Sequence, residues 1–224
     1  MEPNVNTQKV GGEKPSLLGM ITSPGLQFER MKTKSPVWGA FFLFIVIAAI
    51  ASAVTAYQAM NNPELIGNAP DEAAAGMMRN IALGAGAITG LLGAAVWFFI
   101  AAGFYKIIMM LMGNDTPYMK LLSIYLYASI VTYLGVVVNL ILRVVLGGDA
   151  TTSYTSLGTL FEPGTFAYGI GSAFEIFSIW GLVVTGLGLH IAAGLSKKQA
   201  TILVVVFFIL SVAFSSLTGL TPKA

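Results

Sequence analysis

Long runs of apolar residues separated by short polar segments dominate this sequence. A helix that crosses a bilayer needs about 20 mainly apolar residues, because the hydrocarbon layer is about 30 Å thick and the helix rises about 1.5 Å per residue. Five segments qualify, at about 37–57, 84–106, 121–145, 173–195 and 200–217. The sequence therefore predicts an all-α integral membrane protein with five transmembrane helices in one bundle.

The low charge content supports a surface that lies in lipid. Only 10% of the residues are charged, whereas a typical soluble domain carries roughly 25%. The few Lys and Arg residues are not grouped with aromatic residues into a basic face, which argues against a nucleic-acid partner. The bilayer itself is the first partner that this composition predicts.

The distribution of Lys and Arg predicts the orientation of the chain. If the N-terminus is cytoplasmic, the inner segments hold nine of the 12 Lys and Arg residues and the outer segments hold three. Because Lys and Arg in short loops are retained on the cytoplasmic side, we expect a cytoplasmic N-terminus and an external C-terminus.

The N-terminal region divides into two parts. Residues 1–16 show no apolar periodicity and are predicted to be a disordered tail. The segment 17–36 alternates apolar and polar side chains and carries Arg30, Lys32 and Lys34. It is either an amphipathic interfacial helix that these cations anchor to the headgroups of the inner leaflet, or a folded cap against the helix ends.

Two connections between the predicted spans are informative. The turn at 196–199 is short, so the fourth and fifth helices should form a neighbouring antiparallel pair. The loop 147–172 is rich in Gly, Ser and Thr but also holds many large apolar side chains. We expect this loop to fold back onto the helix ends.

Small residues recur along the second and fourth helices, and they let helices approach closely in lipid. The favoured interpretation is packing inside the bundle, and the alternative is a docking face for another membrane protein. The candidate partner-packing residues are Gly86, Gly90, Gly93, Gly181 and Gly186.

Two charged residues lie near the outer membrane surface at similar depth. Arg143 is near the end of the third helix and Glu175 is near the start of the fourth. Charges within a membrane usually find a partner, so an ion pair between them is one interpretation. The other is that each side chain reaches the headgroups alone.

The sequence offers no chemistry for catalysis or for cofactor or metal binding. It has no cysteine and a single histidine, His190, without companions at metal-ligand spacing. Motifs for a nucleophilic serine, a zinc protease or a phosphate loop are absent. The middle of the predicted membrane region is almost free of charge, which disfavours a transporter formed by this chain alone.

Three motifs, in order along the chain, resemble the bacterial branch of the Yip-domain family. The segment Ser23–Met31 with Pro36 is similar to the opening Ser-Pro…Phe-Glu…Pro of that family. The loop Gly113–Lys120 leads into Ser123–Ala128, like the family's glycine loop and tyrosine-alanine segment. The longest similarity is Phe174 to Ala200, and the resemblance covers about 23–218.

The resemblance implies a function as well as a fold. The family is not known for enzymatic activity, and its members bind other membrane proteins. Some bacterial relatives accompany ABC exporters of the macrolide-exporter type, and the N-terminal region here is similar to the Gram-positive branch. The acidic Asp-Leu-Tyr-Gly-Pro element of the eukaryotic members is missing, which argues against a Rab-type partner.

We therefore expect a five-helix Yip-type domain over 37–218 in the plasma membrane of a Gram-positive bacterium. Its expected role is that of a non-enzymatic accessory or regulatory subunit of an ABC-type efflux complex, serving export or protection against a toxic peptide. The alternative is a small channel or a lipid-handling membrane protein.

Overall fold

The computed structural model describes residues 13–61, 66–67, 69–146 and 152–220, and all the regular elements of this part are helices. The all-helical fold is thus confirmed there, while most of the predicted tail 1–16 lies outside the described residues. The helices are α1 (Gly19–Thr22), α2 (Pro24–Arg30), α3 (Trp38–Ala59), α5 (Glu72–Leu111), α6 (Tyr118–Leu146), η1 (Leu157–Leu160), α7 (Phe166–Ala173), α8 (Ile176–Ile191) and α9 (Lys197–Thr218).

Four helices, α3, α5, α6 and α9, are long and apolar enough to cross a membrane. The predicted span 173–195 corresponds to α8, which is apolar but has only 16 residues. At 1.5 Å per residue it is about 24 Å long, shorter than the hydrocarbon layer of about 30 Å. Four of the predicted spans are therefore present at sufficient length. The fifth span and the orientation of the termini stay predictions.

Local hydrogen bonds explain why α8 is shorter than its apolar sequence. At its start, the carboxylate of Glu175 accepts hydrogen bonds from the backbone N–H groups of Phe177 and Ser178. This cap makes Ile176 the first residue of α8 and separates α8 from the short helix α7. At its end, Gly194 takes a φ of +77° and the N–H of Leu195 donates to Leu189 O over 3.1 Å. This left-handed glycine closes the helix.

Helix α5 is much longer than the predicted span 84–106. It has 40 residues, about 60 Å at the usual rise, and extends beyond that span at both ends. The side chain of Asp71 caps its first turn by accepting from Ala74 N over 2.8 Å. It ends only before Gly113, which has a φ of +73°.

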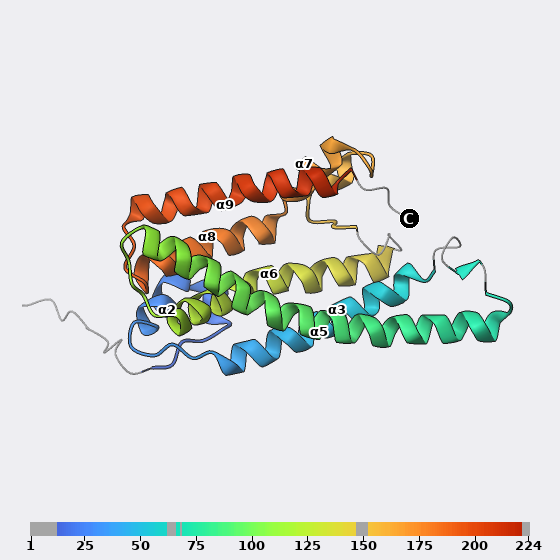
Figure 1. Ribbon diagram of the computed structural model, residues 1–224, viewed down its shortest axis with the longest axis horizontal. Helices are drawn as coiled ribbons and strands as arrows, with labels where there is room; N and C mark the ends of the chain where they lie inside the picture. The colour runs from blue at the N-terminus through green and yellow to red at the C-terminus, as the bar shows by residue number, and fades with distance from the viewer. Residues whose placement is uncertain (1–12, 62–65, 68, 147–151, 221–224) are drawn as a thin grey trace, which may run out of the picture.

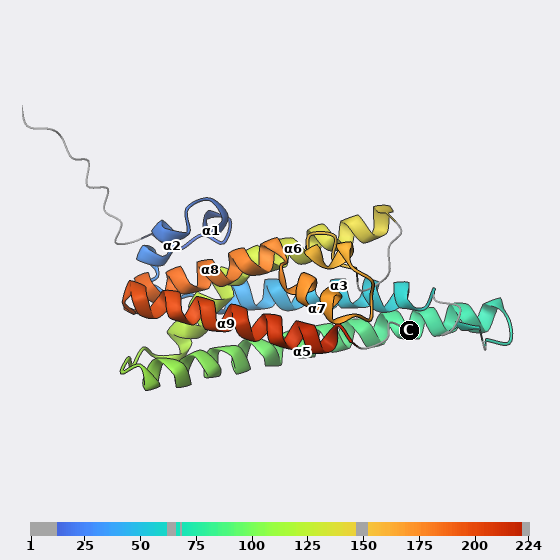
Figure 2. The ribbon, with the colours of Figure 1, turned by 90° about the horizontal axis from the view of Figure 1, so that it is seen from above.

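The helices run nearly parallel or antiparallel to one another (Figures 1 and 2). Helices α3 and α5 form a closely packed pair, α8 packs against both α6 and α9, and α6 also contacts α3 and α5. Helices α1 and α2 lie at the same end as the turns 112–117 and 192–196, which we call the basic end. Within the core, the rings of Phe44 of α3 and Tyr133 of α6 stack with centroids 4.6 Å apart.

The connection between α8 and α9 differs in detail from the predicted turn at 196–199. The side chain of Ser196 accepts from Gln199 N, and that of Gln199 accepts from Ser196 N, which is a complete capping box. Lys197, Lys198 and Gln199 therefore belong to the first turn of α9, and the turn lies at 192–196. The predicted antiparallel pairing of the two helices is confirmed.

Candidate functional site

Two of the candidate glycines hold α3 and α5 together. A β-carbon added at Gly90 would lie 2.5 Å from the carbonyl oxygen of Ala48, and one at Gly86 would lie 2.7 Å from that of Ser52. Both obstacles are backbone atoms of α3, which cannot rotate away as a side chain can. These glycines thus pack inside the chain, as the favoured sequence interpretation expects.

The remaining candidates divide between internal contacts and the outer surface. Gly181 lies against Thr132 of α6, and Gly186 lies against Val204 of α9. By contrast, nothing lies within 4 Å of the position that a β-carbon at Gly93 would take. Of the five candidate partner-packing residues, Gly93 is thus the one that faces outward without an internal contact.

Arg143 and Glu175 lie in one polar cluster with Asn139 and Thr155. The Nε of Arg143 donates to Asn139 O over 3.4 Å, and the Nδ2 of Asn139 donates to Thr155 Oγ1 over 2.6 Å. The hydroxyl of Thr155 in turn donates to Glu175 Oε1 over 2.6 Å. Among the ion pairs of the described residues, none joins Arg143 directly to Glu175.

This cluster attaches the outer loop to the bundle. The guanidinium of Arg143 also donates to Thr55 Oγ1 of α3 over 3.4 Å, and Asn139 Oδ1 accepts from Thr155 N over 3.2 Å. Helix α7 packs against the end of α9, where Gly169 contacts Ser215 and Ser216 closely. The loop does fold back onto the helix ends over its described residues 152–172. The sequence alone does not indicate that Asn139 is the centre of this cluster.

The N-terminal segment packs on the basic end of the bundle. Met20, Phe28 and Met31 are completely buried, the packing that the cap interpretation expects. Arg30 pairs with Glu13, and Lys32 Nζ lies 2.7 Å from Glu29 Oε2. Anchoring of Arg30, Lys32 and Lys34 to lipid headgroups stays a prediction.

The two turns at the basic end are bonded to each other. The side-chain amide of Asn114 donates to Ala193 O over 2.8 Å, and Thr116 Oγ1 donates to the same oxygen over 3.1 Å. Lys106 Nζ lies 2.6 Å from Asp115 Oδ1, and this bond holds the pKa of Asp115 below its usual range. Asn114 thus has a structural role that the sequence alone did not indicate.

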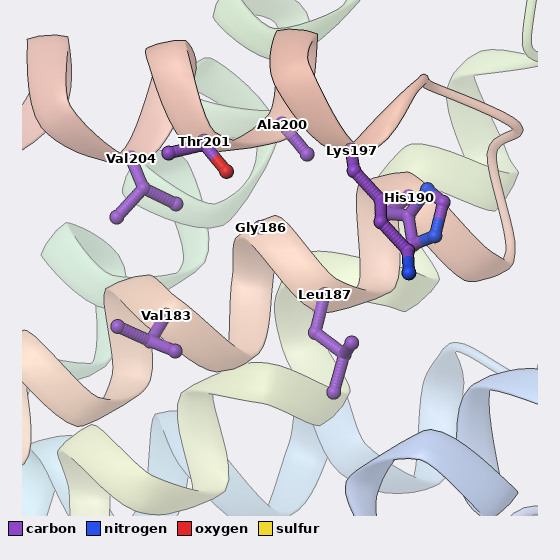
Figure 3. Close-up of a pocket in the computed structure, with 8 residues that line it drawn as sticks. All are labelled: Val183, Gly186, Leu187, His190, Lys197, Ala200, Thr201 and Val204. Carbon is purple, nitrogen blue, oxygen red and sulfur yellow. The ribbon is translucent and has the colours of Figure 1, made fainter.

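A cavity of about 390 Å³ lies between α8 and α9. Figure 3 shows Val183 and Val204 at one end, and His190 beside Lys197 at the other. Between them the lining is mostly apolar, with Gly186 and Ala200 in the middle. Its charged end lies next to the turn 192–196. No group of three or more potential metal-ligating side chains occurs among the described residues.

Comparison with known proteins gives two similarities over nearly the whole chain. The model of the Yip1 domain family matches residues 18–218. Membrane protein YknW of Bacillus subtilis (strain 168) is 35% identical over 228 residues, covering 98% of this chain and 97% of the relative. No solved structure is significantly similar.

Proposed function

This chain belongs to the Yip1 domain family, and from that premise we propose that it is a non-enzymatic plasma-membrane protein that binds other integral membrane proteins. The observation that carries the proposal is the exposure of α5. Only 11% of the most apolar window of this helix is buried within the chain, the smallest share among the four long helices. Lipid or another protein must cover the exposed remainder of this apolar window.

The outer face of α5, defined by Ile88, Leu92, Gly93 and Val96, suits a second helix. The three large residues of this face are between 56% and 62% exposed, and Gly93 lies at the edge of the face, roughly 60° around the helix axis from Val96. Because the hydrophobic effect does not distinguish protein from lipid in a bilayer, helices associate there through close packing at small residues. A partner helix gains such packing at Gly93 without displacing any contact within the chain.

We propose an ABC-type exporter as the partner complex, with export or protection against a toxic peptide as its purpose. This part rests on the resemblance to bacterial relatives that accompany such exporters. Mild-detergent purification of the tagged protein from its native membrane, followed by mass spectrometry, tests it. We expect ATPase and permease subunits in a fixed ratio, and recovery of the chain alone contradicts the proposal.

A matched pair of variants tests whether recovery of the partner depends on the outer face of α5. Gly93→Trp adds a large side chain to the outer face and should release the partner. Ile209→Trp makes a similar change at a site on α9 that is 59% exposed, and the partner should remain. Loss of the partner from both variants, or from neither, would argue against the outer face of α5.

The alternative of a small channel has less support. Glycine is abundant in the second predicted helix, which is the observation behind this alternative. However, the backbone of α3 fills the space beside Gly86 and Gly90. That contact leaves no space for a pore between the two helices at this level. Ion or solute flux through liposomes containing the purified protein would revive this alternative.

A further inference from the structure

The cavity between α8 and α9 changes in polarity from one end to the other. Val183, Gly186 and Val204 line its apolar part, whereas His190 and Lys197 line the end next to the turn 192–196. A turn leaves backbone groups that need water or headgroups, so it marks the boundary of the hydrocarbon layer. The cavity therefore runs from the headgroup region into the hydrocarbon, the direction in which a phospholipid lies.

Among the described residues, Lys197 and Lys198 have no acidic partner. The described acidic residues nearby are Glu13, Glu29 and Asp115, and each pairs with another cation: Arg30, Lys32 or Lys106. Among the ion pairs of the described residues, none uses Lys197 or Lys198.

The start of α9 adds to the attraction for an anion. The first N–H groups of α9, a helix of 22 residues, lie at Lys197 and Lys198, and a helix N-terminus favours negative charge. The Nδ1 of His190 lies 2.6 Å from Leu195 O, and it must be the donor because a carbonyl only accepts. With Nδ1 as the donor, Nε2 of the neutral ring carries a lone pair, so His190 borders the site but is not a source of attraction for an anion.

We propose that this cavity binds an anionic phospholipid, with one acyl chain along Val183, Gly186 and Val204 and the phosphate at Lys197. The volume of about 390 Å³ lies within the usual range for small-molecule sites. Charge complementarity selects an anionic headgroup, and the apolar part requires a chain. The inference does not depend on the proposed protein partner, because the site is formed by α8 and α9 and not by the outer face of α5.

Photo-crosslinking in nanodiscs tests this proposal with the full chain. Phosphatidylglycerol or phosphatidylcholine with a photoactivatable acyl chain is added as a minor component, and the labelled peptides are identified by mass spectrometry. We expect preferential labelling of α8 and α9 by phosphatidylglycerol. The variant Lys197→Gln should reduce that preference about fivefold.

Matched variants separate the cavity from general surface charge. Lys198→Gln removes the same charge one residue away but outside the cavity lining, and should retain the preference. Thr201→Trp, at an exposed position on the lining, should reduce labelling by both lipids. Each variant is compared only if it remains monodisperse in size-exclusion chromatography.

Three results would overturn the proposal. One is equal labelling by the two lipids, and another is an equal loss in Lys197→Gln and Lys198→Gln. The third is competition by glycerol phosphate at millimolar concentration, which would show that the site binds a soluble anion without an acyl chain.

Discussion

The ring of Phe28 lies directly against Gly188. A β-carbon added at Gly188 would lie 2.6 Å from Cε1 of Phe28 and 2.7 Å from Cγ2 of Ile124. The glycine thus creates the space into which a helix that precedes the first span inserts its aromatic side chain. Through this contact the N-terminal segment is packed onto α6 and α8 as part of the folded domain.

Phe28→Ala should therefore destabilise the protein by about 3–5 kcal/mol, the usual cost of removing a buried aromatic side chain. The thermal unfolding midpoint in mild detergent measures the effect. Leu26→Ala is the control, because Leu26 is on the same helix but 42% exposed. An equal decrease for the two variants would contradict the packing of α2.

Gly90→Leu should separate α3 from α5. Its β-carbon would lie 2.5 Å from a backbone oxygen, and forcing extra volume into a packed interface typically costs about 1–3 kcal/mol. Gly93→Leu, three positions along the same helix, meets open space and should change stability by less than about 0.5 kcal/mol. Unfolding midpoints of the two purified variants distinguish them. Equal tolerance of both would mean that the helices are not in contact here.

Asn139→Leu should loosen the outer loop. Asn139 is 8% exposed, and the loss of its side-chain amide leaves the N–H of Thr155 without this acceptor and the hydroxyl of Thr155 without this donor, at a cost of about 1–3 kcal/mol. Hydrogen exchange of peptides covering 152–160 should become faster. Thr159→Ala changes an exposed hydroxyl of the same segment and is the control. Unchanged exchange in Asn139→Leu would contradict the role of the cluster.

The carboxyl of Asp115 should titrate below the range of an ordinary aspartate, because Lys106 stabilises its charged form. Since the folded pKa is lowered, the stabilisation is present above the unfolded pKa. It is lost as the pH falls through the folded pKa. Carbon NMR of labelled aspartate measures the midpoint, and Lys106→Met should move it upward. A midpoint that does not respond to this variant would mean that the pair does not form in solution.

Apolar length predicted the helices well because it depends only on local sequence. The spans 37–57, 121–145 and 200–217 agree with α3, α6 and α9 to within a few residues. The limits of α8 were not predictable, because they depend on the side chain of Glu175 and on the φ of Gly194. Each of these is a single local feature that interrupts an apolar segment, and apolar length does not reveal it.

The candidate site was less predictable for a different reason. Sequence spacing showed that Gly86 and Gly90 share a helix face, but only the packed structure shows that this face meets α3. It also shows that Gly93 faces away. The cavity between α8 and α9 combines residues on both sides of a turn, and the contact of Asn114 with Ala193 spans 79 residues. Such long-range contacts leave no local pattern.

The most direct test of the central claim is photo-crosslinking from Leu92 of α5 in living cells. Leu92 is 57% exposed and adjoins Gly93, and a benzophenone amino acid at this position reaches whatever covers the outer face. The control position is Ile209 of α9. Our account predicts a discrete adduct with another integral membrane protein at position 92, absent at position 209 and lost when Gly93 is changed to Trp. Labelling of lipid alone at both positions would contradict the claim that the outer face of α5 binds a protein.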